Sequence, residues 1–229
     1  MFFSPTYLMY MIPAFLLMAI TSWYVKHAYN KWSRIPAQSR LTGAQAAQQL
    51  ISAGNLYGVK IQSVAGDLTD HYDPRNKTLN LSQGVANVAS VASLAIAAHE
   101  LGHAMQDAEG YFPLRIRAAL VPAVNIGSNL GWILIMIGLF LRFTELAWLG
   151  ILVFSGGAIF ALFTLPVEFD ASARAKQLLV QTGIIQTDEE RRGVNAVLNA
   201  AALTYVAGLI TAIMQLLYYV SLVSGGRRR

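Results

Sequence analysis

The sequence predicts a mainly α-helical membrane protein, in which about four transmembrane helices accompany a small α+β part. Three observations lead to this fold class. Hydrophobic residues make up 55% of the chain and charged residues only 13%, a composition too apolar for an ordinary soluble domain. Polar residues are concentrated in one part of the chain. Apolar stretches near the length that a span needs, roughly 20 residues, recur along the sequence, at residues 1–25, 118–141, 146–167 and 195–223.

The composition also excludes several kinds of site and partner. The chain has no cysteine, so disulfides and thiolate metal sites are excluded, and any metal must be bound by histidine and carboxylate side chains. The formal net charge of +5 is compatible with nucleic-acid binding, but most basic residues lie beside the apolar stretches. That position is typical of residues at a membrane surface. We therefore expect a lipid bilayer, and no nucleic acid, as a partner.

The first apolar stretch, residues 1–25, is interpreted as a transmembrane anchor. A cleaved signal peptide would begin with basic residues and end at a cleavage site of small residues. Here the first basic residues, Lys26 and Lys31, follow the stretch instead. We expect the anchor to be retained, with its N-terminus outside the cytoplasm.

Residues 26–117 form the polar part. Thr42 predicts the N-cap of a helix, and Pro74 predicts a turn between two strands. The capping residue predicts a helix at residues 42–54, and alternating apolar residues predict a strand at 59–64. The turn predicts a β-hairpin of residues 68–73 and 78–82.

Residues 98–104, which contain His-Glu-x-x-His, carry the strongest chemical signal. His99 and His103 are four residues apart, so a helix places both imidazoles on one face, where they can chelate one zinc ion. Glu100 follows the first ligand and can act as general base on a zinc-bound water. Residues 84–98 are small or apolar and uncharged, which predicts a buried helix. Buried imidazoles need polar partners, so we expect a zinc site rather than a solvated helix surface.

Two further spans, residues 118–141 and 146–167, are joined by a short connector and predict a membrane hairpin. Gly127 and Gly131 have the GxxxG spacing that allows helices to approach closely. Polar side chains on the same span suit hydrogen bonds between helices: Asn125, Ser128 and Asn129. Packing is the expected role of all these residues.

The end of the third span offers a candidate third metal ligand. Pro166 suits the first turn of a new helix. Glu168 follows at the expected membrane boundary, where an unpaired charge is costly. The alternative to a zinc ligand is an ordinary interfacial acid, paired with Arg174 or Lys176.

The fourth span, residues 195–223, carries Asn195 and Asn199 four residues apart, with Tyr205 further along. These side chains either pack within the span or line the site from the side. Five segments are expected in the chain: a transmembrane anchor, residues 1–25; a cytoplasmic catalytic part with the His-Glu-x-x-His helix, 26–117; a transmembrane hairpin, 118–167; a cytoplasmic helix with the third ligand, 168–194; and a transmembrane helix with a basic tail, 195–229.

The distribution of basic residues predicts the orientation of the spans. Residues 26–117 and 168–194 hold thirteen of the 17 Lys and Arg residues, so we expect both segments, and the candidate ligands with them, in the cytoplasm. The arginines at 227–229 would then lie outside, against the rule. Either the last span does not fully cross the bilayer, or earlier helices overrule these late charges.

Four stretches together resemble the bacterial neutral zinc metallopeptidases of the YugP type: residues 70–74, 97–104, 165–172 and 198–205. The resemblance covers nearly the whole chain and implies a multi-pass zinc peptidase of the bacterial cytoplasmic membrane. The layout also looks like the HtpX-like and CAAX-prenyl membrane proteases. Those enzymes place two membrane helices between His-Glu-x-x-His and a glutamate ligand in a Glu-x-x-Ala-Asp motif.

This resemblance implies a gluzincin-like site with Glu168 as the third zinc ligand. Ser172 stands where the related motif has Asp, which leaves open which carboxylate supports the ligands. Asp170 or Asp107 can substitute for it.

A metzincin pattern is the rival interpretation of the third ligand. Its third ligand follows the second histidine by six residues, which is Glu109 in this chain. That pattern has Gly where Gln106 stands and His where Glu109 stands. Glu168 is therefore the better candidate.

These residues predict a membrane-embedded zinc endopeptidase that cleaves membrane-associated or misfolded proteins at the cytoplasmic face, as in protein quality control. Tyr205 or His71 can supply a further donor to the developing oxyanion. The hairpin either holds an extended substrate by strand addition or simply covers the zinc helix. The alternative function is a non-enzymatic zinc-binding scaffold or partner protein. A transporter ranks last, because the spans show mainly Asn, Ser and Thr as polar residues.

Overall fold

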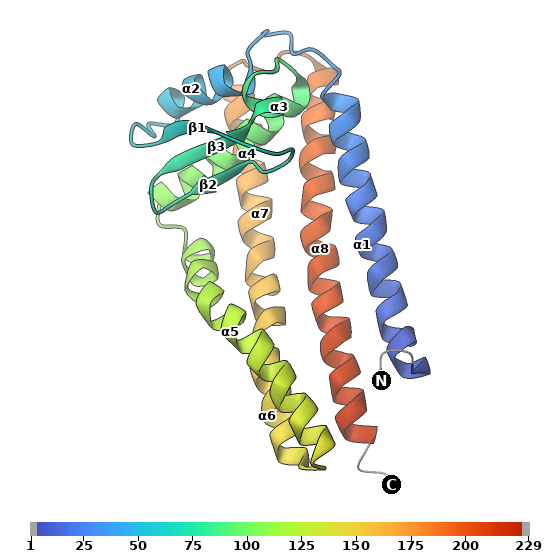
Figure 1. Ribbon diagram of the computed structural model, residues 1–229. Coiled ribbons are helices and arrows are strands. Elements are labelled where there is room, and N and C mark those ends of the chain that lie inside the picture. Colours follow the sequence, from blue (N-terminus) through green and yellow to red (C-terminus); the bar gives the residue numbers. More distant parts are fainter. Residues whose placement is uncertain (1–3, 226–229) are drawn as a thin grey trace. The chain divides into compact units, whose positions relative to one another are not determined.

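The computed structural model describes residues 4–225 and divides the chain into two compact units. Among the described residues, the first unit contains 4–22, 112–166 and 204–225, and the second contains 23–111 and 167–203. The basic tail expected at residues 227–229 lies outside the described residues. Figure 1 shows the elements in chain order. Their bounds are α1 Pro5–Trp32, α2 Gly43–Ala53, β1 Lys60–Val64, β2 His71–Asp73, β3 Thr78–Ser82, α3 Gln83–Ala86, α4 Val91–Ala108, α5 Phe112–Phe140, α6 Thr144–Phe154, α7 Gly156–Gln181 and α8 Asp188–Gly225.

The mainly helical fold with about four membrane helices is confirmed. Within the described residues, four helical segments are long and apolar enough to cross a bilayer: Pro5–Trp32, Phe112–Phe140, Thr144–Gln181 and Asp188–Gly225. The third combines α6 and α7. Large apolar side chains such as Phe15, Ile126 and Leu152 are exposed along these segments, as expected for helices surrounded by lipid.

In the first unit, α5 and α6 pack closely through glycine. A Cβ atom on Gly131 would lie 2.7 Å from the backbone nitrogen of Phe154, and one on Gly150 would lie 2.6 Å from that of Ile135. Gly127, the other member of the GxxxG pair, has more room, because its Cβ would lie 3.5 Å from the carbonyl oxygen of Val153. The expected close packing is therefore confirmed at Gly131, which lets the two backbones approach.

The second unit contains the sheet, in the strand order β1-β3-β2. β2 and β3 pair antiparallel, with Tyr72 opposite Leu79, which confirms the expected hairpin. β1 pairs parallel to β3 on its other side. Figure 1 shows this sheet beside α4. Leucine side chains fill the core between them, and each contributes about 1.5–3 kcal/mol through burial; those at Leu79, Leu81, Leu94 and Leu101 are fully buried.

The helix at residues 42–54 is also confirmed. Thr42 caps α2, since its hydroxyl accepts a hydrogen bond from the Gln45 backbone N–H at 3.3 Å. The Gln45 side chain accepts in return from the Thr42 N–H at 3.0 Å. This reciprocal capping box satisfies two N–H groups that a helix start leaves without partners.

Two expectations about helix boundaries are wrong. Residues 84–98 do not form one helix: α3 ends at Ala86, and Ser90 starts α4 by accepting a hydrogen bond from the Ser93 N–H at 3.1 Å. Pro166 does not start a new helix, because it lies inside α7. A proline removes one hydrogen bond of a helix, and in a membrane span the neighbouring bonds and the apolar surroundings keep the helix intact. Glu168 is therefore carried on the continuation of a long helix.

Candidate metal centre

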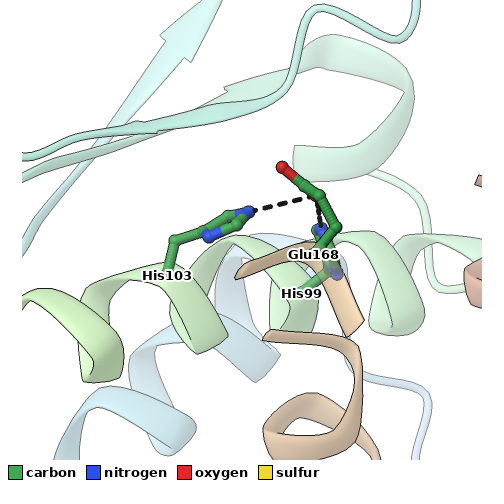
Figure 2. Close-up of side chains that lie close together, drawn as sticks. All are labelled: His99, His103 and Glu168. Carbon is green, nitrogen blue, oxygen red and sulfur yellow. Dashed lines mark hydrogen bonds and ion pairs between the residues drawn. The ribbon is translucent and has the colours of Figure 1, made fainter. Parts of the chain in front are cut away.

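Two histidines of α4 and one glutamate of α7 converge in the second unit. His99, His103 and Glu168 each offer one ligand atom, and these atoms lie within 4.8 Å of one another. The Glu168 Oε2 atom is 3.3 Å from His99 Nε2 and 3.5 Å from His103 Nε2. Figure 2 shows the carboxylate of Glu168 reaching toward both imidazoles. The side chain of Glu168 is only 2% exposed, and those of the histidines 12% and 13%.

The convergence depends on a close approach between α4 and α7 at Gly102. A Cβ atom at this position would overlap the carbonyl group of Ala171. Gly102 lies between the two histidines in sequence, and Ala171 lies three residues after Glu168. Only glycine lets the backbones approach closely enough to bring ligands from both helices to one point.

We expect Gly102→Ala to destabilise the protein and to reduce its zinc content. The added methyl group gains about 1 kcal/mol of helix propensity, but overpacking against a backbone carbonyl costs about 1–3 kcal/mol or more. The thermal unfolding midpoint and the bound zinc of the purified variant test this expectation. Gly208→Ala on α8 is the control, because its Cβ would meet nothing within 4 Å. Equal behaviour of the two variants would contradict the role given to Gly102.

The second nitrogen of each imidazole also has a partner. The Ser172 hydroxyl is 3.2 Å from His99 Nδ1, and the Gln106 side-chain oxygen is 3.0 Å from His103 Nδ1. Ligand histidines in metal sites are usually oriented by such a contact at the nitrogen that does not bind the metal. Here both contacts leave the two Nε2 atoms facing Glu168.

The hairpin contacts Glu100, which lies between the candidate ligands in sequence and is the predicted base. The backbone N–H of Tyr72 on β2 donates to Glu100 Oε2 at 3.0 Å. The Tyr72 hydroxyl donates to the Asp107 carboxylate at 2.9 Å, so one residue fastens the strand to α4 at two points. Burial raises the pKa of the Glu100 carboxyl, and the nearby His99 and His103 oppose that rise. A raised pKa brings a carboxylate closer to the range in which it exchanges protons at neutral pH.

The other acidic candidates have different partners. Asp107 accepts from Tyr72, and Asp170 accepts from the Gln106 amide at 2.8 Å. Arg174 bonds to Asp170 and to Glu109, the second of these at 2.7 Å. Glu109 occupies the C-cap position of α4, its side chain is 56% exposed, and it is not among the three clustered groups. The metzincin-like third ligand therefore finds no support in the geometry.

The remaining candidates are not among the three clustered groups. His71 is exposed on β2, and its Nδ1 donates to the Thr69 carbonyl at 2.8 Å. Asn195 is exposed, and Asn199 accepts from the Lys176 ammonium group at 3.0 Å. Tyr205 lies on α8 in the first unit. The roles suggested for His71, Asn199 and Tyr205 stay predictions.

The comparisons with known proteins show which family the chain resembles. The model of a family described as "Putative neutral zinc metallopeptidase" matches residues 7–224. The chain belongs to this family. It is also 43% identical over 203 residues to the "Putative membrane protease YugP" of Bacillus subtilis (strain 168), an alignment that covers 89% of this chain and 90% of that protein. No solved structure matches the chain significantly.

The donor set of this zinc metallopeptidase family member fits zinc. Two imidazole nitrogens and one carboxylate oxygen are among the ligands that zinc prefers, and sets of three protein ligands are typical of catalytic rather than structural zinc sites. The three donors come from two helices, and the packing of the protein holds them at one point. The three groups that cluster are the candidate ligands that the sequence suggested, but the sequence did not show the contacts of three further residues: Tyr72, Gln106 and Ser172.

Proposed function

We propose that the protein is a zinc-dependent endopeptidase of the cytoplasmic membrane that uses His99, His103 and Glu168 as ligands and Glu100 as the base. The observation that carries this proposal is the convergence of the three donor atoms within 4.8 Å, next to a glutamate held by the sheet. The family supports the class of reaction, since its description names a zinc metallopeptidase.

The chain's own residues account for the proton transfers. A zinc ion in the site supplies a water of lowered pKa and polarises the scissile carbonyl. Glu100 accepts a proton from the attacking water as the new C–O bond forms. It then delivers that proton to the amine nitrogen as the C–N bond breaks. The hydrogen bond from the Tyr72 N–H holds one oxygen of Glu100, which leaves the other for this transfer.

The proposed substrates are membrane-associated or misfolded proteins, cleaved at the cytoplasmic face. Four helices long enough to span a bilayer support the location in a membrane. The excess of basic residues in the segments that carry the ligands supports the cytoplasmic side. A peptidase at this place meets the exposed segments of membrane proteins, which suits a role in their quality control. Tyr205 and His71 remain the proposed donors to the oxyanion.

Removal of the metal tests the proposal. We expect the purified full chain in detergent to contain one zinc ion, to cleave an unfolded casein-like substrate, and to lose cleavage completely in a strong chelator. Added Zn²⁺ should restore the activity. Product formation is measured by mass spectrometry and zinc by elemental analysis. A protein that binds zinc and never cleaves casein or membrane-protein substrates would instead be the non-enzymatic scaffold.

A further inference from the structure

The side-chain amide of Gln106 can be oriented from its surroundings alone. Gln106 is fully buried on α4. Its Nε2 atom lies 2.7 Å from the carbonyl oxygen of Val167 and 2.8 Å from Asp170 Oδ2. Both are acceptors, so the NH₂ group must face them, because an amide oxygen there would meet two other oxygens. The Gln106 carbonyl oxygen therefore faces His103.

This orientation determines which nitrogen of His103 carries a proton. The Gln106 oxygen only accepts hydrogen bonds, so the His103 Nδ1 atom at 3.0 Å must donate. In a neutral imidazole the other nitrogen, Nε2, then has its lone pair available. That atom is the one that faces Glu168 and the proposed zinc position. Gln106 thus selects the tautomer of the neutral ring that carries its proton on Nδ1, and it fixes the direction of the ring.

Asp170 helps to fix the orientation of the Gln106 amide. Its carboxylate holds the Gln106 NH₂ group and is itself bonded to Arg174. The Asp170 carboxylate thus acts on an imidazole through an interposed amide. His99 differs, because the Ser172 hydroxyl at its Nδ1 can donate or accept and does not select a form.

We propose that Gln106 is a positioning residue. Asp170 holds its NH₂ group, so its carbonyl oxygen accepts a hydrogen bond from His103 Nδ1, and this contact sets the metal affinity of the site. The inference rests on the proposed function only in taking His103 as a zinc ligand. It concerns binding rather than cleavage. Partners of this kind typically change metal affinity about 10–100-fold when they are lost.

Zinc affinity of the full chain in detergent, measured by competition with a chromophoric chelator, tests the inference. We expect Gln106→Met, which preserves length and volume but has only a weak acceptor, to bind Zn²⁺ about 10–100-fold more weakly. We expect a smaller loss for Asp170→Asn, which still offers an oxygen to the amide. Gln177→Met is the control. It makes the same change at an exposed position of α7 and should leave the affinity unchanged.

A second measurement separates positioning from mere stability. In the zinc-loaded wild type the His103 Nδ1–H should give a slowly exchanging downfield proton resonance, assignable among only four histidines. Gln106→Met should lose it even at temperatures where the protein stays folded. Zinc affinities of Gln106→Met and wild type within twofold of each other, or an unchanged resonance, would overturn the inference. If Gln106→Met weakens zinc binding as expected but the wild type cleaves nothing, the inference stands and only the proposed peptidase activity is overturned.

Discussion

Glu100→Gln is expected to keep zinc and to lower peptide-bond hydrolysis by about 10²–10⁴-fold, the usual contribution of general acid–base catalysis. The amide of glutamine has the size of the carboxylate, and its oxygen can still accept the hydrogen bond from the Tyr72 N–H. It cannot take a proton from water, however, so both proton transfers lose their carrier. Cleavage of casein at saturating substrate and elemental zinc analysis of the same sample measure the two properties separately.

The control for this prediction is Glu189→Gln, an exposed acid in the first turn of α8. The chemical change is the same, but the residue is not among the groups of the proposed site, so activity should stay within twofold of wild type. Unchanged cleavage in Glu100→Gln would remove the base from the mechanism. Loss of zinc in Glu100→Gln would assign Glu100 to metal binding instead, and the mechanism would again fail.

The ligands differ in how far the sequence alone could identify them. His99 and His103 are four residues apart, and a helix converts that local spacing directly into a pair of adjacent imidazoles. Glu168 is 69 residues from His99, so no local pattern connects them. It became a candidate as an acidic residue at an expected membrane boundary, and the resemblance to membrane proteases then favoured it over Glu109. The structure adds the physical cause, which is the contact between α4 and α7 that Gly102 permits.

The residues around the ligands were not predictable in the same way. The contact of Tyr72 with Glu100 uses a backbone N–H, and every residue of a strand has one, so the sequence carries no mark of it. Gln106 stands three residues after His103, a helical neighbour that could have been noticed. Its other partners, Val167 and Asp170, lie on a different helix. Such networks form only when distant segments meet, which a single sequence does not reveal.

The elements were predicted well where capping or turn chemistry was strong, as at Thr42 and in the hairpin. The break between α3 and α4 was missed because the stretch from Gly84 to Ala98 is mostly small or apolar and carries no charge, so the N-cap at Ser90 does not stand out. The position of Pro166 was misjudged for the opposite reason. A proline is a strong local signal for a helix start, but here it lies inside a long helix whose other hydrogen bonds keep it continuous.

Glu168→Ala is expected to release zinc, whereas Glu109→Ala is expected to retain it. Removal of Glu168 leaves two imidazoles without the carboxylate that lies 3.3 and 3.5 Å from them. The loss of affinity should exceed the roughly 10–100-fold typical of residues that only support a ligand. Zinc per chain after dialysis against a weak chelator measures the difference between the variants.

The comparison is sharp because the two glutamates differ in almost every respect except charge. Glu109 is exposed and pairs with Arg174, and Arg174 would still pair with Asp170 after Glu109 is removed. Glu168 is buried beside both histidines. Loss of zinc in Glu109→Ala alone would replace the proposed site by a metzincin-like one, in which all ligands lie on α4 and its end. Loss in Glu168→Ala alone requires ligands from two helices, and then the approach of α4 to α7 at Gly102 becomes a condition for metal binding.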